Sequence, residues 1–128
     1  EYIPAISESD QSAAMYGPFD YYLNPERGAV PEWSNDKFAV MSWDDWLNYD
    51  PMPSAARLER PVLMIHSDGS VLPDYTKRYF ANIKTERKKL HWISSGAQSP
   101  FEQFDFYDGA EKTQLAVDLA ADWFGANL

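Results

Sequence analysis

The sequence PVLMIH (61–66) is a run of apolar residues that ends in a histidine, and it indicates the fold class of this chain. An unbroken apolar run of this length is typical of a strand that is covered on both faces of a parallel sheet. A second run, LHWIS (90–94), follows a segment with helical spacing that begins at Pro73 and extends to about residue 83. The order strand, helix, strand predicts two parallel strands joined by a right-handed crossover.

A further helix is predicted over residues 111–124, where apolar side chains recur on one stripe. Gly125 stands where a glycine cap would end this helix. Two parallel strands do not make a stable sheet by themselves. Either the first half of the chain supplies more strands, or an N-terminal portion or a partner chain completes the sheet. We favour the second arrangement, in which the chain is a fragment or a processed subunit and an oligomer is possible.

The first half, residues 1–57, is irregular and rich in aromatic residues. Short helices are predicted at 7–16 and 42–48, the second with Ser42 as its N-terminal cap. The segment is expected to be helical in part and to be either a lid over something or a wrapping that packs on a partner surface. Trp43 is the candidate binding residue here, because apolar pockets are often lined by aromatic side chains. The same side chains could instead form a packing surface for a partner chain.

The composition and charge of the chain argue against several classes of function. The 128 residues include 45% hydrophobic and 16% aromatic residues and no cysteine, and the formal net charge is −9. This charge disfavours nucleic acids and anionic membranes as partners. No apolar run is long enough for a membrane span and no signal-peptide pattern is present, so a cytoplasmic location is expected. The two histidines lie far apart in the sequence, which argues against a zinc site.

The second half resembles the C-terminal part of an α/β-hydrolase, in the dienelactone-hydrolase-like branch. The residues that carry the resemblance are RPVLMIHSDGSVLPDYTKRYFANI (60–83) and KKLHWISSGAQSPFEQFDFYD (88–108), followed by the terminal helix. The resemblance covers residues 58–128 and implies an α/β fold with flanking helices, preceded by the cap-like segment 1–57. It also implies action on a small ester, lactone or related acyl compound, without a metal or organic cofactor.

In such enzymes a serine on a G-x-S-x-G turn attacks the carbonyl, a histidine removes its proton and an acid orients the histidine. The 128 residues contain no G-x-S-x-G, so the resemblance places the nucleophile outside this chain. Its pattern places Ser70 at the acid's position. We favour Asp68 as the acid, because it follows the strand directly at the edge where α/β proteins bind ligands. Alternatively, Asp68 caps the turn at Gly69.

The resemblance places either Gln98 or Gln103 at the position of the catalytic histidine. A glutamine does not exchange protons near neutral pH, so neither can be a general base. His66, at the end of the first strand, is the candidate replacement, whereas His91 is expected to be a packed strand residue. A scheme based on carboxylates, from Asp68 or the acidic residues near 105–108, remains open. So do a non-catalytic protein of the same fold and an unrelated α+β interaction domain.

Overall fold

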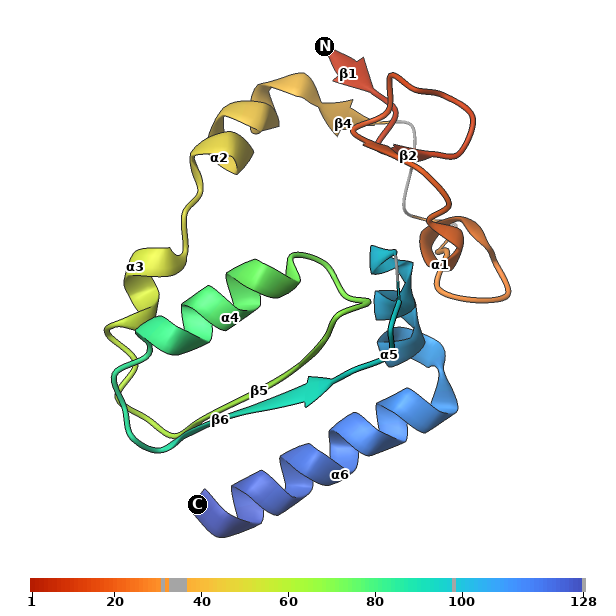
Figure 1. Ribbon diagram of the computed structural model, residues 1–128. Helices are drawn as coiled ribbons and strands as arrows, with labels where there is room; N and C mark the ends of the chain where they lie inside the picture. Colours follow the sequence, from red (N-terminus) through yellow and green to blue (C-terminus); the bar gives the residue numbers. More distant parts are fainter. Residues whose placement is uncertain (31, 33–36, 98, 128) are drawn as a thin grey trace. The chain divides into compact units, whose positions relative to one another are not determined.

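The computed structural model describes residues 1–30, 32, 37–97 and 99–127. The chain is of the mixed α/β type and divides into two units, Glu1–Tyr49 and Asp50–Leu128 (Figure 1). The boundary lies a few residues before the predicted one at 57/58. That residues 1–57 act as a cap stays a prediction. Each unit is described by itself below.

The second unit is built around two parallel strands. β5 (Val62–Ser67) pairs with β6 (Lys88–Ile93), from Val62 opposite Lys88 to Ser67 opposite Ile93. They are joined by α4 (Pro73–Asn82), which begins at Pro73, where a fixed φ and a missing N–H are both tolerated. The predicted strands, their parallel direction and the helix between them are confirmed.

Helices cover both faces of this strand pair. Figure 1 shows α4 on one side and α6 (Ala110–Asn127) on the other. A short helix, α3 (Met52–Ala55), packs against α4, where the Ser54 hydroxyl lies 2.8 Å from that of Tyr79. The 3-10 helix η2 (Pro100–Phe104) and α5 (Asp105–Asp108) lead from β6 into α6. The prediction of a cap at Gly125 is wrong, because α6 continues through it to Asn127.

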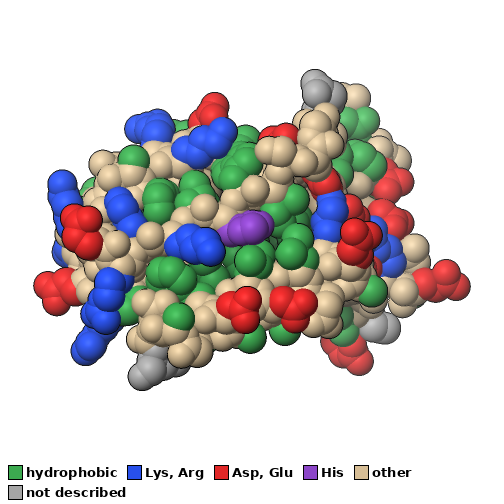
Figure 2. All heavy atoms as spheres, turned by 60° about the horizontal axis from the view of Figure 1, so that its bottom comes forward, with side chains coloured by type: hydrophobic (Ala, Val, Ile, Leu, Met, Phe, Trp, Pro, Cys, Tyr) green, Lys and Arg blue, Asp and Glu red, His purple; other side chains and the backbone are tan. Residues whose placement is uncertain are grey.

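The apolar run of β5 is less covered than its composition predicts. Among the described residues only β6 pairs with β5, and both outer edges of the pair have no neighbouring strand. The residues of β5 are half-buried, apart from the buried Ser67 at its end. Figure 2 shows hydrophobic side chains on the surface of the face that carries α6. The described part of this unit therefore leaves much of its own apolar surface in contact with solvent.

The first unit contains two small strand pairs and short helices. β1 (Tyr2–Ile3) pairs antiparallel with β4 (Phe38–Ala39), and β2 (Ile6–Ser7) pairs parallel with β3 (Met15–Tyr16). The helical elements are α1 (Asp20–Leu23), the 3-10 helix η1 (Val40–Ser42) and α2 (Trp43–Asn48). The helix predicted at 42–48 is confirmed, and Ser42 directly precedes it as predicted, but Ser42 does not cap it through its side chain. Ser42 has helical backbone angles as the last residue of η1, and its side chain bonds no helix N–H.

The helix predicted at 7–16 is wrong, and side-chain bonds to the backbone explain why. The Ser7 hydroxyl accepts hydrogen bonds from the N–H groups of Ser9 and Asp10, at 3.2 and 2.9 Å. The Asp10 carboxylate then accepts one from Ser12 N–H at 2.9 Å. Such bonds give the backbone partners in a turn and compete with helix formation. The turn returns the chain so that Met15 N–H reaches the carbonyl of Ala5 at 2.9 Å.

Candidate functional site

The candidate site lies at the edge where β5 and β6 end. Because the two strands are parallel, both carboxyl ends meet at this edge, and the loops that follow them are neighbours. One loop runs from Asp68 to Leu72, and the other contains Ser95 and Gly96. Leu72 adopts a left-handed conformation with φ of 55°, which is uncommon for a residue with a side chain and is held here directly before Pro73.

Asp68 links the two loops. Its carboxylate oxygens accept hydrogen bonds from the backbone N–H groups of Ser95 and Gly96, at 3.0 and 3.1 Å. The bond from Ser95 N–H contributes most to lowering the pKa of Asp68 below its ordinary value, and the positive charge of Lys77 adds a smaller attraction. Asp68 is therefore an ionised acceptor near neutral pH, tied to the loop after β6.

A second carboxylate, Glu102, lies beside this link. The Ser95 hydroxyl donates a hydrogen bond to one of its oxygens, and the Lys112 ammonium group contacts the other. Lys112 also binds Asp105 at 3.1 Å. These contacts, first the one from Lys112 and then the one from Ser95, lower the pKa of Glu102. Partial burial lowers the pKa of Lys112, but the hydrogen bonds to Glu102 and Asp105 outweigh it and raise that pKa overall.

Sequence reasoning did not identify Glu102 and Lys112 as residues of this site. Glu102 stands in η2 and Lys112 in the first turns of α6, and no motif pairs them. Gly69 was the one residue in the sequence that could have indicated a close neighbour at this turn. The Glu102 carboxylate occupies the space that a Cβ at Gly69 would need, so the turn admits only glycine without rearrangement.

His66 has both ring nitrogens turned to the backbone. Nδ1 lies 2.9 Å from the carbonyl oxygen of Ser67, and Nε2 lies 3.2 Å from that of Val71. The ring stacks on Trp92 with centroids 5.4 Å apart. A general base needs a free ring nitrogen aimed at the proton it removes. In the described contacts both ring nitrogens of His66 lie against carbonyl oxygens, so neither is free to remove a proton. His66 is therefore better suited to holding the loop.

Gln103 bridges the loop after β5 and the helix α5. Its side-chain oxygen accepts a hydrogen bond from Val71 N–H at 3.0 Å, and its amide nitrogen donates one to the Tyr107 hydroxyl at 2.8 Å. Ser70 is buried and lies 2.8 Å, oxygen to oxygen, from the buried Ser67. A pocket of about 270 Å³ brings three of the predicted residues together; its lining is Ile65, His66, Ser70, Gln103, Phe106 and Ala116.

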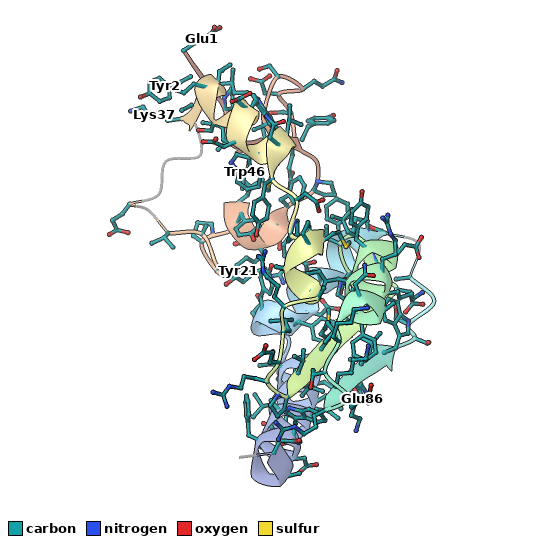
Figure 3. All side chains as sticks on the ribbon, turned by 90° about the vertical axis from the view of Figure 1, so that its left-hand side faces the viewer. Glu1, Tyr2, Tyr21, Lys37, Trp46 and Glu86 are labelled. Atoms are coloured by element: carbon teal, nitrogen blue, oxygen red, sulfur yellow. The ribbon has the colours of Figure 1, made fainter. Side chains whose placement is uncertain are left out.

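Two further predicted residues of the described chain, Asp68 and Trp43, are not in the lining of this pocket. Gln98 lies outside the described residues. Trp43 lies in the first unit, where its ring is 5.0 Å from that of Phe38. It helps to line a mostly apolar pocket of about 360 Å³, together with Ala5, Ile6, Ala14, Met15, Tyr22, Phe38 and Trp46. Figure 3 labels Trp46, which comes from the same helix, α2.

Within the described ranges, no three histidine, aspartate or glutamate side chains gather closely enough to hold a metal ion. The helices in those ranges include none with the length and apolar character needed to span a bilayer. Comparison with family models, curated proteins and solved structures finds no match to this chain.

Proposed function

We propose that residues 58–128 form the C-terminal part of an α/β-hydrolase-like protein that acts on a small ester, lactone or related acyl compound. The observation that supports this most is the link between Asp68 and the amides of Ser95 and Gly96. It joins the loops after two adjacent parallel strands. In α/β-hydrolases these are the loops in which the catalytic acid and histidine stand.

In this proposal the nucleophile comes from strands that pair with the free edges of β5 and β6. These strands belong to an N-terminal portion of the protein or to a partner chain. The pocket lined by His66, Ser70 and Gln103 forms one wall of the acyl-binding site. Its volume of about 270 Å³ is slightly below the usual range for small-molecule sites, about 300–1,000 Å³, as expected of a wall that other residues complete.

A non-catalytic protein of the same fold is the second candidate, and the hydrogen bonds of the site favour it at one point. Both polar atoms of the Gln103 side chain have partners, and both nitrogens of His66 face carbonyl oxygens. Among the described residues at this edge, His66 is thus not free to accept a proton from a serine, and the Gln103 amide cannot act as a base. Such a protein would bind an acyl compound without turning it over.

Labelling of the full-length gene product with a serine-reactive fluorophosphonate separates the two candidates. If the protein is an enzyme, we expect a covalent adduct and hydrolysis of p-nitrophenyl acetate. The Asp68→Asn variant should lose most of that hydrolysis. Asp74→Asn is the matched control, because Asp74 is also an aspartate near the same loop, in the first turn of α4. Absence of both adduct and hydrolysis in a folded protein would reject the enzyme and leave the binding protein.

A further inference from the structure

The edge at which β5 and β6 begin carries most of the positive charge of the second unit. Six of the nine lysines and arginines in residues 50–128 precede or open these strands: Arg57, Arg60, Lys84, Arg87, Lys88 and Lys89. Glu59 and Glu86 are the acidic residues among them; Glu86 is labelled in Figure 3. Figure 2 shows Lys and Arg side chains gathered at its left-hand end, where these segments lie in Figure 1. This edge therefore carries a net positive charge, although the net charge of the whole chain is −9.

The cations at this edge do not all have the same role. Lys88 donates hydrogen bonds to the carbonyl oxygens of Phe80 and Ile83, at 3.1 and 2.7 Å, and so caps the end of α4. Arg60 and Arg87 are exposed, and neither guanidinium forms an ion pair with a carboxylate of the described residues. These two arginines are therefore available to an external anion.

Arg60 and Arg87 line one pocket together with an aromatic wall. The pocket has a volume of about 360 Å³, and its lining is Arg60, Pro61, Arg87, Trp123, Phe124 and Asn127. Trp123 and Phe124 come from α6, whereas the arginines come from the segments that lead into β5 and β6. Guanidinium groups bind carboxylates and phosphates through paired hydrogen bonds, and a tryptophan ring packs well against another flat ring.

We propose that this pocket binds a small aromatic anion, a flat ring that carries a carboxylate or a phosphate group. Charge complementarity selects the anionic group, because the cavity is lined by two arginines that form no ion pair with a carboxylate of the described residues. Trp123 and Phe124 select the ring, because a bare anion would leave their apolar surface in contact with water. Phe124 is 55% exposed. The pocket is at the opposite end of β5 from Asp68, so its role is independent of the proposed acyl site.

The test uses two fluorescent probes that differ by one anionic group. 8-Anilinonaphthalene-1-sulfonate carries a charge, whereas N-phenyl-1-naphthylamine has the same rings without it. With the full-length gene product we expect Arg60→Gln and Arg87→Gln each to weaken binding of the anionic probe about tenfold, the loss of about 1.4 kcal/mol for one charged contact. Binding of the neutral probe should not change in either variant.

Arg57→Gln is the matched control, because Arg57 belongs to the same charged edge but does not line the pocket. It should bind both probes as the wild type does. If it loses as much affinity for the anionic probe as Arg60→Gln, or if Arg60→Gln and Arg87→Gln lose none, the proposed pocket is wrong.

Competition tests the aromatic part of the ligand separately. Phenyl phosphate should displace the anionic probe at concentrations at which inorganic phosphate does not, because only the former packs on Trp123. Equal displacement by both would overturn the requirement for a ring. Added salt should weaken the binding of the anionic probe and leave the neutral one unchanged, and this readout needs no variant.

Discussion

Asp68 shows how much one side chain contributes to this molecule. Its two oxygens accept hydrogen bonds from backbone groups 27 and 28 positions away, and so hold the loops after β5 and β6 together. The same bonds stabilise the ionised carboxylate and lower its pKa. A residue with such contacts serves the structure whether or not it also serves as a catalytic acid, which is why its effect on stability should be measured apart from activity.

The stability of the protein should depend on pH through Asp68. Its pKa in the folded state lies below the ordinary value of 3.8, so the unfolded chain takes up a proton first as the pH falls. The stabilisation is therefore complete above about pH 5 and is lost as the pH falls through the folded pKa. We expect the free energy of unfolding, measured with urea, to fall more steeply below pH 4 in the wild type than in Asp68→Asn. Parallel curves would contradict this role.

The glycines of the second unit show how elements constrain one another. Gly69 lies in the turn after β5, where the Glu102 carboxylate of η2 and Ala97 of the loop after β6 lie against it; a Cβ built at Gly69 would be 2.7 Å from that of Ala97. Gly125 lies within α6, and a Cβ there would meet nothing within 4 Å. The first glycine is required by packing between elements, whereas the second weakens a helix without any such reason.

Replacing these two glycines by alanine should have opposite effects. Gly69→Ala should destabilise the protein by about 1–3 kcal/mol, the usual cost of forcing atoms into a filled space. Gly125→Ala should stabilise it by about 0.5–1 kcal/mol, because alanine favours a helix interior over glycine. Urea unfolding of the full-length gene product, as the wild type and as both variants, measures the two changes. A Gly69→Ala variant as stable as the wild type would show that the turn can relax away from Glu102.

Among the described residues of each unit, taken by itself, little of the apolar surface is buried. Four hydrophobic residues of the described chain are buried, Ile6, Ala55, Ile83 and Phe104, although 45% of the sequence is hydrophobic. Large side chains remain exposed in both units, among them Met41 at 86% and Leu47 at 79%. Burial of apolar surface is the main favourable term in folding, so these 128 residues gain little of it by themselves.

Residues 1–128 produced alone should therefore unfold without a sharp transition. We expect a broad thermal melt by near-ultraviolet circular dichroism and association at high concentration, because exposed apolar patches and free strand edges promote it. The full-length gene product, or a complex with a chain that supplies further strands, should melt cooperatively. A cooperative melt of residues 1–128 as a monomer would show that the open edges of β5 and β6 need no partner.

Sequence reasoning was most successful where one segment decides its own structure. The apolar run before His66 and the proline at 73 predicted β5 and α4 correctly, because strand preference and a fixed φ act locally. It failed at residues 7–16, where side-chain bonds from Ser7 and Asp10 replace helical ones. It also failed at Gly125, where α6 continues to Asn127. At these positions weak local preferences for helix and for turn compete, and the amino-acid composition does not decide between them.

The residues alone are enough to predict β5, α4, β6 and most of α6, together with the parallel direction of the two strands, since apolar spacing and crossover handedness follow from local chemistry. The contacts between polar groups follow only from how these elements pack. Asp68 reaches Ser95 and Gly96 because the register sets Ser67 opposite Ile93, and Glu102 meets Lys112 because η2 folds back onto α6. These partners are far apart in the chain, so their contacts depend on how the elements pack and not on any one segment.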